Sequence, residues 1–108
     1  MNLDNIALEL HKTAKSKGFY DELDMKSFNS QAKQLAMIHS EVTEVLEALR
    51  KSKGEKAVVE ELADILIRVL DLWYALYDNQ VVHSSIDEVL AEKSSINKNR
   101  EKMHGVLG

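Results

Sequence analysis

Cysteine and proline are absent from this sequence, and glycine occurs only four times in 108 residues. Without cysteine the chain can form neither disulfides nor thiolate metal sites, so a reducing compartment, the cytoplasm, is the expected location. Proline and glycine usually mark turns and strand ends. Their scarcity in a chain rich in Leu, Ala, Glu and Lys therefore predicts an all-α fold.

The sequence also lacks a long apolar run and an excess of positive charge. No stretch approaches the roughly 20 apolar residues of a membrane span, and the first residues have neither the basic nor the apolar segment of a signal peptide. The net charge of -4 argues against a binder of nucleic-acid polymers, which would need a basic surface. We expect one soluble domain over residues 1–108, with no membrane and no nucleic-acid polymer as partner.

The spacing of apolar residues predicts four helices, at about residues 3–17, 27–51, 55–78 and from 84 or 85 onward. Gly18 would end the first helix, and a short polar turn at 51–54 would join two antiparallel neighbours. Ser85, with Glu88 three residues later, matches a capping box at the start of the fourth. These features together predict a four-helix bundle.

The third expected helix is apolar around more of its circumference than a surface helix needs. Its apolar residues are Val58, Val59, Leu62, Ile65, Leu66, Ile67, Val69, Leu70, Leu72, Trp73 and Leu76. A helix of this kind is buried on several sides, and a chain this short buries only a modest share of its surface by itself. We therefore expect the extra face to meet a second subunit.

Two pairs of carboxylates carry the clearest functional signal. Glu41 and Glu44 lie three residues apart in one expected helix, and Glu61 and Asp64 lie three apart in the next. Residues three apart share a helix face, so antiparallel packing can bring all four together. Converging carboxylates repel one another unless a cation lies among them, and oxygen ligands favour Mg²⁺, Mn²⁺ or Ca²⁺. The pattern predicts a metal site for phosphate chemistry; the alternative is solvated acids with local partners, such as Asp64 with Arg68.

A basic segment follows the acidic pairs. Lys93, Asn97 and Arg100 are spaced four and three, which places them on one helix face. Lys and Arg hold phosphate oxygens, and Asn can donate to them. A solvated basic helix end that complements the helix dipole explains the same residues without a ligand. Beside an acidic metal cluster, however, this basic strip predicts a triphosphate site.

These motifs resemble those of the MazG-like nucleoside triphosphate pyrophosphohydrolases, which belong to the all-α NTP pyrophosphatase superfamily. The segment E-V-T-E at 41–44, a gap of 16 residues and E-L-A-D at 61–64 are similar to the E-x-x-E … E-x-x-D signature of that family. The run at 93–105 resembles its phosphate-binding tail. Residues 11–20 are similar to the stretch where some members place base-contacting aromatics.

The resemblance implies an all-α bundle that forms a homodimer or homotetramer and hydrolyses (deoxy)nucleoside triphosphates to the monophosphate and pyrophosphate, as nucleotide-pool house-cleaning. It implies that the four acids bind Mg²⁺, with Mn²⁺ as a substitute, and that Glu44 or Glu41 activates water. The basic strip would hold the triphosphate. His11, Phe19 and Tyr20 would contact the base.

Two positions depart from the family pattern. Many members have a further Glu just before the first pair, where this chain has Ser40, and some have an aromatic four residues after the last acid, where this chain has Arg68. The first departure leaves the water-activating group open. Two other interpretations also remain: a related phosphohydrolase acting on another phosphorylated metabolite, such as phosphoribosyl-ATP, and a non-catalytic helical interaction module whose acids are only solvated.

Overall fold

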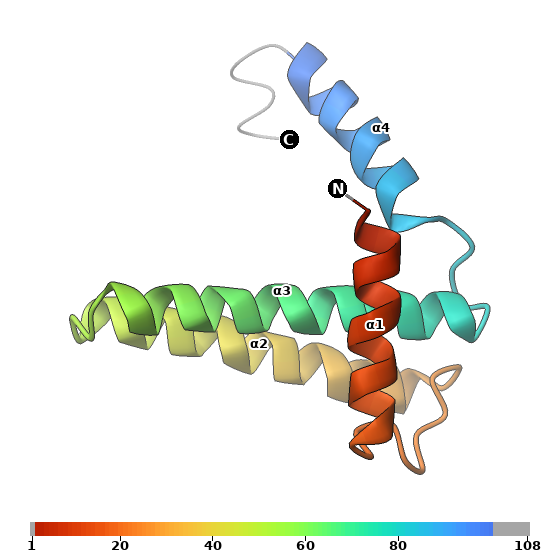
Figure 1. Cartoon of the computed structure of the whole chain (residues 1–108), viewed down its shortest axis with the longest axis horizontal. Coiled ribbons are helices and arrows are strands. Elements are labelled where there is room, and N and C mark those ends of the chain that lie inside the picture. The colour runs from red at the N-terminus through yellow and green to blue at the C-terminus, as the bar shows by residue number, and fades with distance from the viewer. Residues whose placement is uncertain (1, 101–108) are drawn as a thin grey trace.

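A computed structural model of the chain describes residues 2–100, which form four α-helices and no strand. In chain order (Figure 1) the helices are α1 (Leu3–Ser16), α2 (Phe28–Arg50), α3 (Glu55–Asp78) and α4 (Ile86–Asn99). Gly18 follows α1 with a positive φ of 83°, and the side chains of Ser27 and Ser85 cap α2 and α4. The predicted all-α fold is confirmed, and the helices begin and end close to the predicted residues.

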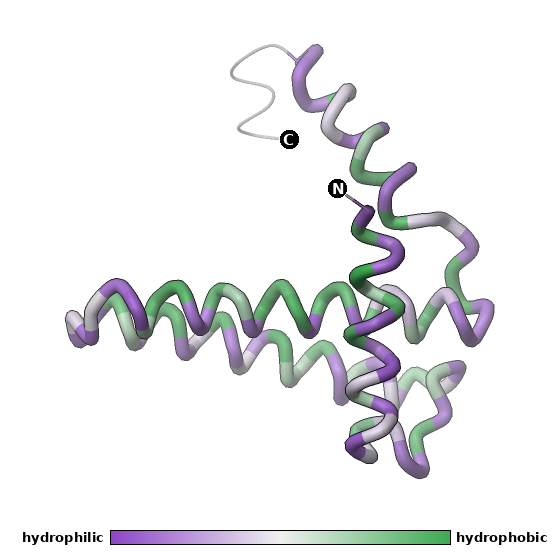
Figure 2. Tube along the Cα trace, viewed as in Figure 1, coloured by the Kyte–Doolittle hydropathy of each residue, from purple (hydrophilic) through white to green (hydrophobic). Residues whose placement is uncertain are grey.

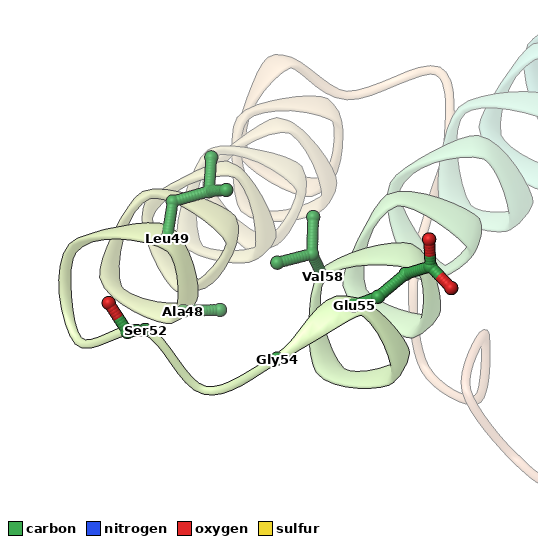
Figure 3. A pocket seen from close by; sticks show the side chains of 6 residues that line it. All are labelled: Ala48, Leu49, Ser52, Gly54, Glu55 and Val58. Carbon is green, nitrogen blue, oxygen red and sulfur yellow. The ribbon is translucent and has the colours of Figure 1, made fainter.

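The helices α2 and α3 form a long antiparallel hairpin (Figure 1). The turn at 51–54 needs a left-handed backbone at Ser52 and Gly54, with φ of 52° and 99°. Glycine adopts this conformation without a steric cost, which fits its place directly before α3. The turn leaves a shallow, mostly apolar depression of about 340 Å³, where Leu49 and Val58 project from the two helices (Figure 3).

The first helix crosses α3 near the end of the hairpin opposite to this turn (Figure 1). The two buried apolar clusters consist of Ala7, Leu70 and Ile86, and of Met25, Leu72 and Ala75. The small side chains of Ala7 and Ala75 allow the backbones to approach closely, and both are 0% exposed. The core therefore lies where α1 crosses the hairpin, and much of the hairpin has no cover from this chain.

The N-termini of α1 and α4 cap each other. The Asp4 carboxylate accepts hydrogen bonds from the Ile86 backbone N–H at 2.8 Å and from the Ser85 hydroxyl at 2.9 Å. In return the Asp87 carboxylate accepts from the backbone N–H groups of Leu3, at 3.0 Å, and Asp4, at 3.2 Å. The first N–H groups of a helix have no acceptor within it, and carboxylates there also complement the helix dipole. This reciprocal cap fixes the start of α4 to the start of α1.

Beyond its first turns, α4 projects away from the other helices (Figure 1). All residues from 91 to 100 are exposed. Within one chain, therefore, three helices pack together, and the fourth joins them only through its N-terminal end.

Apolar residues recur along both helices of the hairpin (Figure 2). Many of their large side chains are exposed. We call the exposed residues that share one side of the hairpin its apolar hairpin face; they are Leu35, Val42, Leu46 and Leu49 on α2 and Val59, Leu62, Leu66 and Val69 on α3. Among the described residues, no large side chain is fully buried. Soluble monomers rarely expose so much clustered apolar surface. Within residues 2–100, no helix combines the length and the hydropathy of a membrane span.

Candidate metal and nucleotide site

The two acidic pairs converge where α2 and α3 face each other. One carboxylate oxygen each from Glu41, Glu61 and Asp64 lies within 4.8 Å of the other two. Glu44 lies close enough to Glu61 to raise the pKa of its carboxyl. The antiparallel hairpin thus brings oxygens of three of the acids together, with Glu44 beside Glu61. We call these four acids the acidic cluster.

Glu61 is the acid whose charge is least well compensated. Its Oε2 is buried and has no hydrogen-bond partner among the described residues. A hydrogen bond with the Glu44 carboxyl, which needs a shared proton, raises the pKa of Glu61, and desolvation and the negative charges of Glu44, Glu41 and Asp64 raise it further. A divalent cation would replace that proton and relieve the repulsion, so the acidic cluster could hold such an ion.

One basic residue contacts the acidic cluster. The Nε of Arg68 donates to Oε1 of Glu41 at 3.1 Å, joining α3 to α2. The two side chains are 31% and 17% exposed, so this pair is better shielded from solvent than the other Lys and Arg ion pairs of the described chain. The local alternative paired Arg68 with Asp64 on the same helix, and the structure shows the pair across helices instead.

A cleft of about 370 Å³ opens beside the acidic cluster. Glu41 and Asp64 form part of its wall, so the cluster and the cleft are continuous. The other polar side chains that line it are Thr13, Lys17, Arg68 and Asp71, and Phe19 and Ile67 are among its apolar residues. A cleft that combines apolar surface with charged groups has the character of a small-molecule site.

The three candidate base contacts lie in different environments. Phe19 is 60% exposed and lines the cleft. His11 is 4% exposed, and its Nδ1 lies 2.7 Å from Oδ1 of Asp71. Tyr20 packs edge-on against His11, and burial together with the charge of Asp71 raises the pKa of its phenol. Phe19 is therefore available to a ligand, whereas His11 supports Asp71 and Tyr20 packs against His11, its buried hydroxyl without a hydrogen-bond partner among the described residues. Trp73 packs against the first core cluster.

The basic strip is not brought to the acidic cluster within one chain. Lys93 and Asn97 lie on the projecting part of α4, and Arg100 is its C-cap. All three are exposed, and α4 points away from the hairpin (Figure 1). Residues 101–105, the last part of the segment that resembles the family's phosphate-binding tail, lie outside the described part of the chain.

The sequence did not lead us to predict Lys17 or Asp71 as site residues, and it gave Arg68 only a partner on its own helix. For Arg68 and Asp71, both on α3, the sequence does contain a signal. Glu61, Asp64, Arg68 and Asp71 are spaced three, four and three, so they form one polar stripe along an otherwise apolar helix. An extended polar stripe on such a helix indicates a site longer than the acidic pair. No comparable pattern marks Lys17.

Comparison with known families identifies the family to which the chain is similar. The family model described as the MazG nucleotide pyrophosphohydrolase domain matches residues 29–105. The match covers more than half of the chain and includes the hairpin with its four acids, as well as α4. No curated protein and no solved structure matches the chain.

Proposed function

The chain belongs to the MazG nucleotide pyrophosphohydrolase family, and we propose that it hydrolyses nucleoside or deoxynucleoside triphosphates to the monophosphate and pyrophosphate with Mg²⁺. The observation that carries this proposal is the convergence of Glu41, Glu61 and Asp64 oxygens within 4.8 Å, beside a cleft of about 370 Å³. We propose a cytoplasmic role in removing surplus or damaged nucleotides.

The donor set fits a hard divalent cation. All four proposed ligands are carboxylates (Glu41, Glu44, Glu61 and Asp64), and the buried, unpartnered Oε2 of Glu61 supplies an oxygen that no protein group satisfies. Oxygen-only sites suit Mg²⁺ and Mn²⁺. When bound, the ion would neutralise charge on the triphosphate and make the α-phosphorus more electrophilic.

We propose Glu44 as the group that accepts the proton of the attacking water. Its side chain is exposed and lies outside the set of three converging oxygens, so it can face a water molecule. Glu41 is held by Arg68, which makes it the weaker candidate. Ser40 cannot accept the proton as a carboxylate could. In the reaction, water oxygen bonds to the α-phosphorus, the bond to pyrophosphate breaks, and the water proton passes to Glu44.

We place the base in the cleft. The exposed ring of Phe19 offers a face for stacking. Asp71 offers a carboxylate oxygen that His11 holds in position, and Tyr20 packs against His11, so these two residues would affect the base indirectly.

We also propose that two copies of the chain pair through the apolar hairpin face, as a homodimer or as half of a homotetramer. Two identical hairpins can cover each other symmetrically, and pairing would bury side chains such as Leu46 and Leu62 that are at least half exposed in one chain. It would also allow the basic strip of one subunit to serve the acidic cluster of another, which α4 does not reach in its own chain.

Product analysis tests the reaction. Purified protein with Mg²⁺ and a panel of NTPs and dNTPs should yield monophosphate and pyrophosphate, and EDTA or Glu61→Gln should abolish turnover. Glu60→Gln is a matched control, because Glu60 is exposed and its nearest cation, Lys56, is 3.9 Å away on the same helix. Turnover of phosphoribosyl-ATP alone would assign the related phosphohydrolase reaction. A folded protein with neither turnover nor Mg²⁺ binding would indicate an interaction module.

A further inference from the structure

Arg68 lies at the boundary between the acidic cluster and the cleft. Its guanidinium holds Oε1 of Glu41 at 3.1 Å, and the same side chain lines the cleft together with Lys17. Among residues 2–100, no other Lys or Arg forms an ion pair with the acidic cluster. Arg68 is therefore the one positive group that compensates the cluster in the described structure.

This position opposes the binding of a divalent cation. The guanidinium takes up Oε1 of Glu41 and leaves only its other oxygen free for a metal, and a positive charge beside the ion repels it. The Arg68 side chain is 31% exposed, so it is not locked in place by packing. The cleft next to it is where the proposed substrate would lie, and phosphate oxygens accept two parallel hydrogen bonds from a guanidinium.

We propose that Arg68 is an exchangeable counter-ion. It holds Glu41 while the acidic cluster contains no divalent cation, and it transfers its hydrogen bonds to a phosphate oxygen of the metal–nucleotide complex. The inference rests on the proposed function. Its consequence is a coupling between the two ligands: free metal must displace Arg68 without replacement, whereas the metal–nucleotide complex supplies a new partner. The site then binds the complex in preference to the free ion.

A fixed role for Arg68 makes the opposite prediction. If Arg68 only orients Glu41 for the metal, its removal weakens metal binding, because a correctly positioned ligand is lost. If it is an exchangeable counter-ion, its removal strengthens the binding of metal alone and weakens the binding of nucleotide. The two roles therefore differ in the sign of a measurable change.

Titration of free Mn²⁺ by electron paramagnetic resonance tests this on the whole chain. We expect Arg68→Met and Arg68→Gln to bind Mn²⁺ about five- to tenfold more tightly than the wild type, since one positive charge beside the ion is gone. With Mn²⁺ saturating, both should bind an α,β-methylene nucleoside triphosphate about tenfold or more weakly, because a charge-assisted contact is lost. Arg68→Lys keeps the charge and should bind Mn²⁺ as the wild type does. Arg50→Met is the matched control, since Arg50 pairs with Glu47 at the exposed end of α2.

The test needs only one of the two variants, Arg68→Met or Arg68→Gln, provided that its circular dichroism shows native helix content. Unchanged or weaker Mn²⁺ binding by that variant overturns the inference. The wild type could bind Mn²⁺ and hydrolyse nucleotide while the Arg68 variants bind Mn²⁺ and nucleotide with wild-type affinity. In that case only the counter-ion role of Arg68 fails, and the proposed function stands. If the wild type takes up no Mn²⁺, the proposed function fails with it.

Discussion

Glu61 is placed where the fold makes its ionisation difficult. Its Oε2 is buried without a partner, and the nearby acids raise its pKa. A protein gains nothing from such repulsion in the metal-free state. The proposed cation would explain the arrangement, because it would turn each repulsive contact into a shared bond.

We therefore predict opposite effects of Glu61→Gln on two forms of the protein. The amide removes one negative charge and can donate to Glu44, so the metal-free variant should melt at a temperature equal to or above that of the wild type. The increase in melting temperature that Mg²⁺ or Mn²⁺ gives the wild type should be lost. Thermal melts with and without metal measure both, with Glu60→Gln as the control. A variant that Mg²⁺ still stabilises as fully as the wild type would exclude Glu61 as a ligand.

Phe19 is the aromatic residue that a base can reach in the cleft. Phe19→Ala should raise KM about three- to tenfold through the loss of one stacking contact, with little change in stability, because the ring is 60% exposed. Phe28→Ala is a suitable control, since Phe28 is 78% exposed and does not line the cleft. Steady-state kinetics with the preferred nucleotide measure the effect. Equal KM values for the two variants would remove Phe19 from the site.

At the scale of helices, the reciprocal cap of Asp4 and Asp87 is what positions α4. Burial opposes ionisation of Asp4, but hydrogen bonds from Ile86, Ser85 and Asp87 outweigh it and lower the pKa of this carboxyl. Asp4→Ala should lower the free energy of unfolding by about 1–2 kcal/mol, as expected for a lost helix cap. It should also speed amide hydrogen exchange in the first turn of α4. Glu9→Ala, on the exposed side of the same helix, should change neither by much.

The same cap should show a defined pH dependence. Because its folded-state pKa lies below the ordinary value of 3.8, Asp4 contributes stability that is fully present above that value and is lost as the pH falls through the lower, folded-state pKa. The stability difference between wild type and Asp4→Ala should therefore shrink below pH 3.8. Urea denaturation across an acid pH series measures it. A difference that stays constant to the lowest pH would contradict the ionised cap.

The helices were predictable because their signals are local. Gly18 ended α1, Ser85 capped α4, and the spacing of the acidic pairs placed them on facing helices. The reciprocal cap was not predictable, since Leu3 and Asp87 are 84 positions apart and no periodic pattern links them. The partner of Arg68 was not predictable for the same reason. Its spacing along the helix indicated Asp64, and only the packing of α2 on α3 shows that the partner is Glu41.

At the scale of the whole molecule, the sequence predicted apolar stripes but not which of them the chain would cover itself. The buried residues of α2 are Ser30, Gln34 and Ala48, whereas Leu46 and Leu49 are exposed. The chain thus buries small or polar side chains of α2 and leaves these two leucines exposed. Hydrophobicity alone does not show whether an apolar residue is buried by its own chain or left exposed.

Leu46→Glu tests whether the apolar hairpin face joins two copies. The wild type should sediment as a dimer or tetramer, and a carboxylate buried in an apolar interface should weaken association by roughly a hundredfold or more. The variant should then sediment as a folded monomer. Asn29→Glu adds the same charge at an exposed position of α2 and should leave the oligomer intact. A monomeric wild type would contradict the proposed pairing.

Complementation between two inactive variants tests which subunit supplies the basic strip. One variant is Glu61→Gln, and the other carries both Lys93→Ala and Arg100→Ala. If each site combines the acids of one subunit with the strip of another, a mixed dimer contains one site with both parts intact, although neither variant alone does. Random exchange of subunits should then restore about a quarter of wild-type activity. A mixture of Glu61→Gln with Asp64→Asn should restore none, since both changes lie in the acidic cluster. Activity that stays at the level of the separate variants would instead assign the strip to its own chain, which would require α4 to fold back towards the hairpin.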